Sequence, residues 1–153
     1  MDSVEYYVSD GYNEINAAMR SGVTTPEIRK HITNIIQEID AKGVVSDVYA
    51  TYKFTDWEGY KTCQIGDVIT DAGFFSQSDD KHAAERSASS PSMGVLLCLK
   101  WDKLPKALFL EEEDEILTYP GVELTIIDIK QRPAFRLVKA TVRSTYRTDL
   151  WKF

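Results

Sequence analysis

Residues 111–121 read Glu-Glu-Glu-Asp-Glu-Ile-Leu-Thr-Tyr-Pro-Gly. Five consecutive acids stand directly before an apolar pair and a Tyr-Pro-Gly turn. If a strand begins here, alternate residues face the same side, so Glu113 and Glu115 would project together while Asp114 would face away. Two carboxylates held in one cleft repel each other, which tends to raise one pKa and leave that group partly protonated for hydrogen bonding to a sugar hydroxyl. By itself, a run of acids is more often a solvated loop, and that alternative stays open at this point.

A second informative segment lies upstream and reads Gly-Asp-Val-Ile-Thr-Asp-Ala-Gly-Phe-Phe-Ser-Gln-Ser over residues 66–78. Ser76 and Ser78 are spaced to present both hydroxyls on one face, directly after two aromatic residues that can stack on a flat ring. The alternative is a capping segment, in which Ser78 only opens the next helix.

A third segment, Tyr-Ala-Thr-Tyr-Lys-Phe over residues 49–54, is an alternating strand with one cation, Lys53, among aromatic side chains. A lone lysine on a strand is usually a solvated charge. A cation beside a pyrophosphate would instead make charge-assisted hydrogen bonds. His31 and His82 have no partner at metal or triad spacing, and neither a G-x-G-x-x-G nor a Walker motif is present, so no metal site and no Rossmann-type dinucleotide site is expected.

The first third of the chain is predicted to be helical. Ser9 or Asp10 can cap a helix that runs to about Arg20, before Gly22. A second helix is predicted from the Thr25 cap and Pro26 to Lys42-Gly43, because isoleucines recur in it at helical spacing. A short helix is expected over 79–87 and a flexible loop over 87–92.

After Gly43, β-branched and aromatic residues become frequent and glycines separate shorter segments. Strands are predicted over residues 47–54, 62–65, 73–76, 94–101, 115–118, 122–130 and 134–145. Helices in front of a largely antiparallel sheet system indicate an α+β domain.

Bulk composition narrows the classes of protein that the chain can belong to. Its 153 residues are 43% hydrophobic, enough for a single domain over residues 1–153. The formal charge of −6 makes nucleic acid and anionic membranes improbable partners. No basic region followed by an apolar stretch begins the chain, so no signal peptide is expected. The longest apolar runs are strand-sized, so no membrane-spanning helix is expected either. A cytoplasmic protein is therefore predicted, in the producing cell or in a host cell.

Taken in order, these segments resemble the mono-ADP-ribosyltransferase family of bacterial toxins and phage enzymes that modify arginine, with its Arg-Ser-Glu site and Glu-x-Glu motif. The helix pattern Tyr…Ile-Asn…Leu-Arg has a counterpart in residues 12–20, Tyr-Arg in residues 52–53, and Gly-Asp…Gly-Phe…Ser-Thr-Ser in residues 66–78. Glu-x-Glu followed by aliphatic residues and Pro-Gly matches residues 113–121. The likeness covers about residues 10 to 130.

The resemblance implies N-terminal helices on two mainly antiparallel sheets that form a cleft for NAD, the co-substrate. It implies that Glu115 holds the ribose 2′-hydroxyl and stabilises the cationic sugar as nicotinamide leaves. By the same resemblance, Glu113 orients or deprotonates the attacking arginine of a target protein. Ser76 would orient the ribose and Glu115. The NAD-binding positions that it implies are Lys53, Ser78, Gly73, Phe74, Phe75, Tyr12, Asn16 and Arg20. Leu110 or the adjacent Phe109 would recognise the protein substrate.

Two departures from the family pattern limit these implications. Lys53 replaces the usual arginine, and an ammonium cannot make the bidentate contact of a guanidinium, although Arg20 can compensate. Gln77 replaces the middle threonine of the serine motif, with a side chain expected to face away from the paired serines.

Two alternative functions remain. One is a catalytically inactive relative that serves as a binding or inhibitory module. The other is a transferase that acts on nucleic acid, against which the acidic net charge argues.

Overall fold

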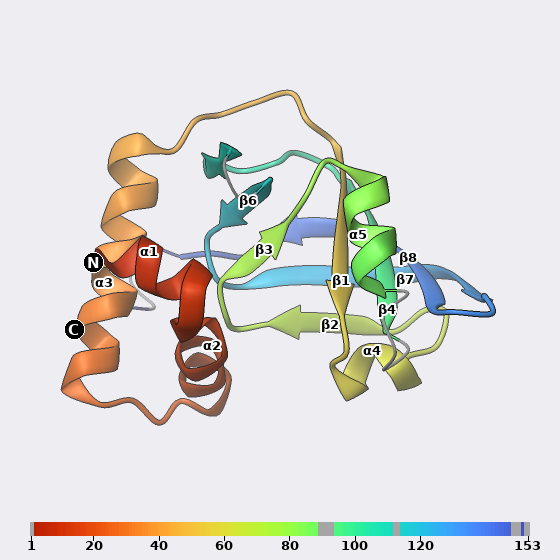
Figure 1. The fold of residues 1–153 in the computed structure, drawn as a ribbon, viewed down its shortest axis with the longest axis horizontal. Helices are drawn as coiled ribbons and strands as arrows, with labels where there is room; N and C mark the ends of the chain where they lie inside the picture. The colour runs from red at the N-terminus through yellow and green to blue at the C-terminus, as the bar shows by residue number, and fades with distance from the viewer. Residues whose placement is uncertain (1, 89–93, 112–113, 148–150, 152–153) are drawn as a thin grey trace.

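The computed structural model describes residues 2–88, 94–111, 114–147 and 151. Its helical front consists of α1 (Ser3–Tyr6), a π-helical turn η1 (Tyr7–Gly11), α2 (Tyr12–Ser21) and α3 (Pro26–Lys42). Figure 1 shows these helices gathered on one side of the molecule, with the sheets on the other.

The first helical segment begins earlier than predicted. Asp2 caps α1 by accepting a hydrogen bond from the Glu5 amide at 2.8 Å, and the chain stays helical from there to Ser21. The predicted cap at Ser9 or Asp10 is wrong, because Ser9 lies inside the helical segment and its hydroxyl donates back to the Glu5 carbonyl. The end of the segment is as predicted, since Gly22 adopts the left-handed conformation with φ of 76°.

The prediction for α3 is confirmed at both ends. The Thr25 hydroxyl accepts from the Ile28 amide, Pro26 is the first helical residue, and Lys42 is the last before Gly43. Ile28, Ile32, Ile35 and Ile39 form its buried face, while Ile36 is half-buried. The helix forms where the sequence signals place it because capping and the apolar stripe agree.

The strands form two sheets, in agreement with the expected α+β class. The larger sheet has the order β1-β4-β8-β7-β2, in which only the β4–β8 pair is parallel, and the smaller sheet is antiparallel with the order β3-β6-β5. The bounds of the strands are β1 Ala50–Thr55, β2 Val68–Asp71, β3 Phe75–Gln77, β4 Val95–Trp101, β5 Ala107–Leu110, β6 Glu115–Thr118, β7 Val122–Gln131 and β8 Arg136–Ser144.

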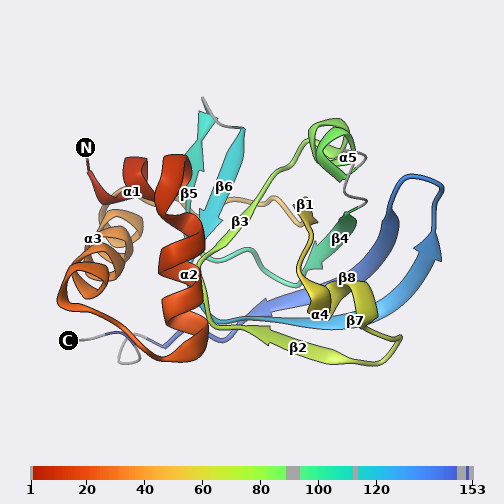
Figure 2. The same ribbon diagram turned by 60° about the horizontal axis from the view of Figure 1, so that its bottom comes forward.

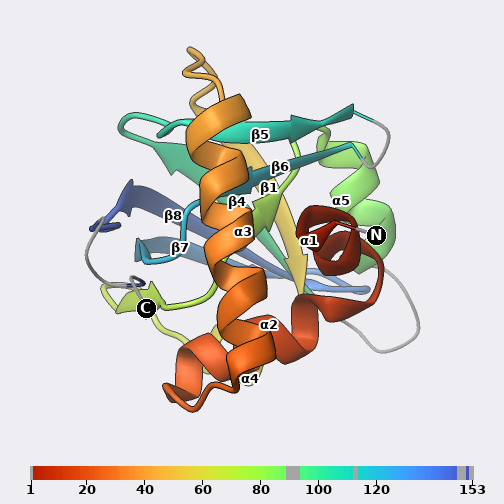
Figure 3. The ribbon, with the colours of Figure 1, turned by 90° about the vertical axis from the view of Figure 1, so that its left-hand side faces the viewer.

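Two apolar cores cover opposite faces of the smaller sheet. One face, with Phe75 and Ile116, packs on the larger sheet, and the other, with Leu108 and Leu117, packs on α2 and α3. Figure 2 shows the resulting layers, and Figure 3 shows α3 lying across β5 and β6. A third, smaller cluster joins α5 (Lys81–Ala88) to the outer face of the larger sheet. The smaller sheet is therefore a central layer, and its exposed end can form a site.

Three strand predictions need correction. The strand predicted over 62–65 is wrong, because residues Glu58–Thr62 form the short helix α4 and Gly66 turns the chain with φ of 93°. The Arg136 guanidinium holds this segment by donating to the carbonyls of Tyr60 and Cys63, contacts that depend on tertiary structure. Strands β2 and β5 were not predicted; they pair with β7 and β6 respectively, contacts that depend on tertiary structure.

Strand β6, Glu115–Thr118, has the predicted bounds, whereas other elements differ from prediction at their ends. Strand β1 begins at Ala50 instead of residue 47, and β3 is Phe75–Gln77 instead of 73–76. The helix expected over 79–87 is α5, Lys81–Ala88, so the first residues of the loop expected over 87–92 are helical. Residues 89–93 of that loop lie outside the described residues.

Candidate active site

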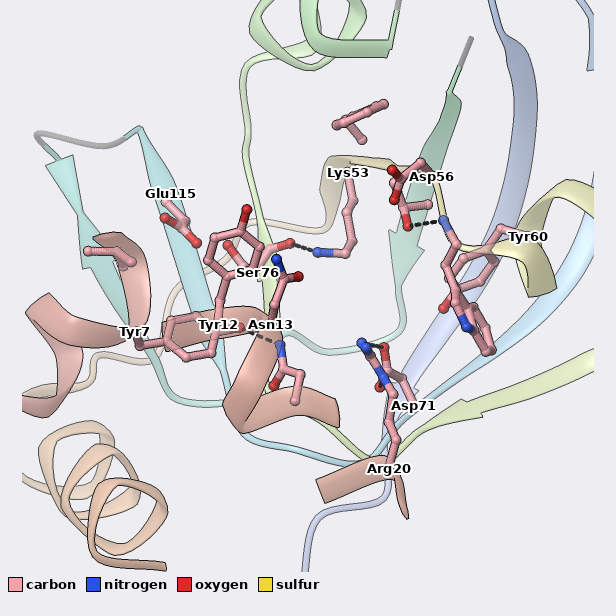
Figure 4. Close-up of a pocket in the computed structure, with 15 residues that line it drawn as sticks. Tyr7, Tyr12, Asn13, Arg20, Lys53, Asp56, Tyr60, Asp71, Ser76 and Glu115 are labelled. Atoms are coloured by element: carbon pink, nitrogen blue, oxygen red, sulfur yellow. Dashed lines mark hydrogen bonds and ion pairs between the residues drawn. The ribbon is translucent and has the colours of Figure 1, made fainter. Parts of the chain in front are cut away.

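A cleft of about 550 Å³ opens between the helical front and the larger sheet. One wall comes from η1 and α2, the opposite wall from β1 and α4, and β3 and β6 contribute Ser76 and Glu115 (Figure 4). The residues that line it are Tyr7, Val8, Tyr12, Asn13, Asn16, Arg20, Lys53, Phe54, Thr55, Asp56, Trp57, Tyr60, Asp71, Ser76 and Glu115. Six of the twelve sequence-predicted positions that the structure describes line this cleft, namely Tyr12, Asn16, Arg20, Lys53, Ser76 and Glu115.

The pairing of β3 with β6 brings Ser76 and Glu115 to one face. Ser76 lies opposite Leu117, so the side-chain alternation of β6 puts Glu115 on the same face as Ser76. Both residues line the cleft and a contiguous hollow of about 240 Å³ that extends toward α5. Glu113, the other predicted carboxylate, lies outside the described residues.

Lys53 reaches the cleft from β1. Its ammonium donates to the Ser76 carbonyl at 2.6 Å and lies 4.9 Å from the centre of the Phe75 ring. Burial lowers the pKa of Lys53, an effect that the nearby carboxylates of Asp71 and Glu115 oppose. The lysine is thus a partly buried cation at the back of the cleft instead of a solvated strand charge.

Gln77 points away from the cleft, as expected for the residue between two serines. Its side-chain carbonyl accepts from the Thr51 hydroxyl at 2.6 Å and from the Trp101 indole at 2.9 Å, and its amide donates to Thr118. This buried network joins β3 to β1, β4 and β6. It therefore fixes the backbone from which Ser76 enters the cleft.

Asn16 fastens α2 to the segment before β3. Its amide nitrogen donates to the Tyr7 hydroxyl, and its carbonyl accepts from the Phe74 backbone amide, each at 2.9 Å. A Cβ on Gly73 would lie 2.8 Å from the Asn16 carbonyl oxygen, so only glycine permits this close approach. Asn16 and Gly73 thus shape the cleft by positioning its wall.

Arg20 is held in a bidentate ion pair at the lower end of the cleft. Its Nε and Nη2 each lie 2.9 Å from a carboxylate oxygen of Asp71, which is buried and also accepts from the Gly73 amide. The guanidinium lies 5.9 Å from the Trp57 ring centre. Its charge is therefore largely neutralised within the protein, while its exposed side still faces the cleft.

The two phenylalanines of the serine segment lie in different cores. Phe74 packs among the residues of α2 and α3, and Phe75 packs between the sheets, because neighbouring residues of an extended chain face opposite sides. Both are fully buried, and neither belongs to the lining of the cleft.

The other predicted positions lie around the rim. Tyr12 lines the cleft and is 46% exposed. The Ser78 hydroxyl accepts from the Asp80 amide at 3.0 Å, a turn contact before α5, whereas the amides of His82 and Ala83 in the first turn of α5 donate to the Asp80 carboxylate; Asp80, not Ser78, therefore caps this helix. Ser78 also lines the small hollow beside Glu115. Leu110 pairs directly with Glu115 across the β5–β6 hairpin, and Phe109 pairs with Ile116.

Sequence reasoning missed several residues of the cleft, above all those of α4 and the segment before it. Tyr60 is 1% exposed, and its buried hydroxyl has no hydrogen-bond partner within the described part of the chain. Its ring meets Trp57 edge to face with centres 5.0 Å apart. Burial raises the pKa of the Tyr60 phenol above its ordinary value, so the hydroxyl stays protonated and can donate. The sequence after Lys53 holds no motif that signals these roles.

Two further findings concern the described residues only. No group of three or more histidine, cysteine, aspartate or glutamate side chains among them is arranged to hold a metal ion. No helix within the described ranges has the length and apolar character that crossing a membrane requires.

The chain matches no protein-family model and no curated protein. It is similar in structure to Vis toxin, an ADP-ribosyltransferase from Vibrio splendidus, with a TM-score of 0.70 and 20% identity over 94% of this chain and 72% of the toxin. Vis has also been solved in complex with agmatine.

Two other proteins of known structure are similar over most of their length. Plx2a, an ADP-ribosyltransferase toxin from Paenibacillus larvae, gives a TM-score of 0.73 at 18% identity, over 93% of this chain and 84% of Plx2a. C3stau2 from S. aureus, solved with NAD, gives 0.74 at 14% identity, over 94% and 85% of the two chains. The chain therefore has the fold of the ADP-ribosyltransferase toxins, with N-terminal helices and two sheets.

Proposed function

We propose that this protein is an NAD-dependent mono-ADP-ribosyltransferase that modifies arginine on a target protein. The observation that carries the proposal is the convergence of Glu115, Ser76, Lys53 and Arg20 on one cleft, in a fold shared with ADP-ribosyltransferase toxins. These residues come from β6, β3, β1 and α2, and only tertiary packing brings them together.

The chemical character of the cleft fits a dinucleotide. Lys53 uses one ammonium hydrogen on the Ser76 carbonyl and keeps two for a diphosphate, while the outer side of the guanidinium of Arg20, which is paired with Asp71, adds further N–H donors. A buried hydroxyl without a partner, such as that of Tyr60, calls for a bound molecule or water to complete its hydrogen bonding. The side of the cleft formed by β3 and β6, with Ser76 and Glu115, offers acceptors and a donor for the hydroxyls of a ribose.

Glu115 is proposed to stabilise the transition state electrostatically. The bond between ribose C1′ and the nicotinamide nitrogen breaks, and its electron pair leaves with nicotinamide, whose ring becomes neutral. Positive charge then develops on the ribose ring, where a carboxylate that accepts from the 2′-hydroxyl lowers its energy. Ser76 holds the ribose and Glu115 in register, because both side chains rise from the same face of the β3–β6 pair.

Arginine is the proposed acceptor. A guanidinium nitrogen forms the new bond to C1′ and loses its proton to Glu113, which is needed because the pKa of a free guanidinium is far above neutral. Vis, a structural relative, has been solved with agmatine, a compound that carries the same guanidinium group. This is consistent with an acceptor of that chemistry here.

The test combines labelled NAD with a nuclease-treated cell lysate. The purified wild-type protein should transfer label to a discrete protein, and Glu115→Gln should lower both transfer and NAD hydrolysis by at least about 100-fold, as expected when an electrostatic catalytic group is lost. Glu113→Gln should reduce transfer to arginine more than hydrolysis. Equal losses in the two reactions would contradict the separate roles.

The same assay distinguishes the competing functions. Absence of NAD binding by calorimetry, together with absence of nicotinamide release, would identify an inactive binding module. Label that disappears after nuclease treatment would identify nucleic acid as the acceptor. Either result would overturn the proposal.

A further inference from the structure

A second hollow, of about 880 Å³, shares Glu115 with the proposed NAD cleft and is lined by residues of β5 and β6. It runs between α1, the C-terminal half of α3 and the β5–β6 hairpin, elements that lie close together in Figures 2 and 3. Its apolar surface comes from Val4, Val44, Leu108, Phe109, Leu110 and Ile116. Val44 is 52% exposed although its backbone pairs with Ala107, so an apolar side chain is held open to solvent by ordered structure.

The rim of this groove carries a strong excess of negative charge. The acidic side chains that line it are Asp2, Glu5, Glu38, Asp79, Glu111, Asp114 and Glu115. Among the described lining residues the one cation is Lys42, which is already paired with Glu38 at 3.2 Å. An occupant that brings positive charge is favoured, because oppositely charged surfaces attract during encounter and docking. Acidic and neutral segments gain nothing from the rim.

The groove is continuous with the proposed reaction centre. Glu115 lines both the groove and the NAD cleft, and Leu110 in the groove pairs directly with Glu115. A chain segment seated in the groove therefore ends beside the carboxylate where the sugar would react. A separate surface elsewhere on the molecule would not deliver an arginine to this position.

We propose that this groove docks the acceptor protein through a basic segment in which lysine or arginine residues alternate with apolar ones. The apolar side chains would cover Val44, Phe109 and Leu110, and the cations would lie along the acidic rim. The inference rests on the proposed transferase function and specifies its partner. A second copy of this chain is a poorer occupant, because its net charge is also negative.

The experiment compares two charge-neutralising variants. The groove variant is Glu5→Gln, Glu38→Gln and Asp114→Asn; asparagine tolerates the left-handed backbone of Asp114, whose φ is 52°. The matched control is Asp10→Asn, Asp102→Asn and Asp128→Asn, three acids outside the lining of the groove, with the same change in net charge. Thermal unfolding verifies that both variants fold.

Binding is measured without NAD, by fluorescence anisotropy, with three labelled twelve-residue peptides: arginine alternating with leucine, arginine alternating with serine, and glutamate alternating with leucine. The arginine–leucine peptide should bind best. Its affinity should fall by about tenfold in the groove variant, since each partly exposed charge pair contributes a factor of about two, and should change less than twofold in the control.

Equal weakening of peptide binding in the two variants would mean that only the net charge matters, and would overturn the proposal. Tightest binding of the glutamate peptide would also overturn it. Self-association of the wild type in sedimentation that excludes the peptide would assign the groove to a second copy. Because no step of this measurement uses NAD, a protein that binds the peptide but never transfers ADP-ribose would refute the proposed activity and leave the groove's preference for a basic, apolar segment standing.

Discussion

The buried hydroxyl groups of the cleft differ in whether the folded protein already provides them with a hydrogen-bond partner. The hydroxyls of Tyr7 and Tyr60 are both buried, but Tyr7 accepts a hydrogen bond from Asn16 while Tyr60 has no partner within the described residues. A buried hydroxyl without a partner costs stability, whereas a paired one does not. The contrast indicates that Tyr60 is shaped for a ligand and Tyr7 for the protein.

Phenylalanine substitutions test this contrast. Tyr60→Phe should leave the free energy of unfolding unchanged or raise it by about 1 kcal/mol, and should weaken NAD binding by about five- to tenfold, because one hydrogen bond to the ligand is lost. Tyr7→Phe, the matched control, should lower the free energy of unfolding by about 1–2 kcal/mol, since a buried amide of Asn16 loses its acceptor. Urea denaturation and calorimetry measure the two quantities; a destabilised Tyr60→Phe with normal affinity would contradict the assignment.

Lys53 makes the site sensitive to alkaline pH. Burial lowers its pKa from the ordinary value of 10.5, so the ammonium loses its proton, and with it the attraction for a diphosphate, at a pH below that value. The affinity for NAD should therefore be highest well below the lowered pKa and fall by about tenfold as pH rises through it. A bound diphosphate favours the charged form, so NAD binding should take up a proton in this range.

Calorimetry from pH 7 to 10 checks the pH effect in wild type and in Lys53→Arg. Arginine stays charged throughout, so the variant should keep its affinity across the range. Among the buried groups of the cleft, the phenols of Tyr7 and Tyr60 have pKa values raised by burial and Arg20 stays charged, so Lys53 is the buried group expected to change. Parallel loss of affinity in the two proteins would place the titrating group elsewhere.

At the scale of elements, the cleft depends on how α2 is attached to the segment between β2 and β3. Two side chains one helical turn apart, Asn16 and Arg20, make the attachment through the Phe74 amide and the Asp71 carboxylate. Both were assigned to NAD binding by resemblance alone. Their contacts show that they fasten α2, one wall of the cleft, to the end of β2 and to the residue before β3.

Alanine substitutions on α2 distinguish the loss of the Asn16 hydrogen bonds from a change in helix propensity. Asn16→Ala should lower the free energy of unfolding by about 2–3 kcal/mol, because it leaves the buried Phe74 amide and the Tyr7 hydroxyl without partners. Asn13→Ala, on the exposed side of the same helix, has the same change in helix propensity and should stay within about 0.5 kcal/mol of wild type. Similar losses in the two variants by chemical denaturation would mean that the attachment contributes little.

At the scale of the whole molecule, the site lies where the two sheets diverge. The Tyr52–Ser78 bridge joins β1 to β3 at this point, and the Thr51–Gln77–Trp101 network ties the same strands below it. Lys53 follows Tyr52 in sequence and Ser76 precedes Gln77, so these contacts fix the backbone positions of both cleft residues. The cleft is therefore formed by rigid strands, which suits a site that must hold charged groups in fixed geometry.

Much of the fold was predictable where local signals agree with each other. Helix α3 was predicted with both ends, since the Thr25 cap, Pro26 and the isoleucine stripe all favour it. The α+β class and most long strands were also predicted. The strands β2 and β5 and the helix α4 were not, because they depend on pairing with β7 and β6 and on contacts such as those of Arg136.

The sequence by itself determined the class of the fold, the order of its motifs and the candidates Glu115, Ser76 and Lys53, because capping, periodicity and motif order are properties of the chain. Only the tertiary structure decided that Arg20 pairs with Asp71, that Phe74 and Phe75 belong to different cores, and that Tyr60 enters the cleft. These facts depend on contacts between residues distant in sequence, which local patterns do not encode. The acidic run illustrates both contributions. Its composition was compatible with a site or with a solvated loop, and the pairing of β6 with β3 placed Glu115 on the same face as Ser76, in the cleft.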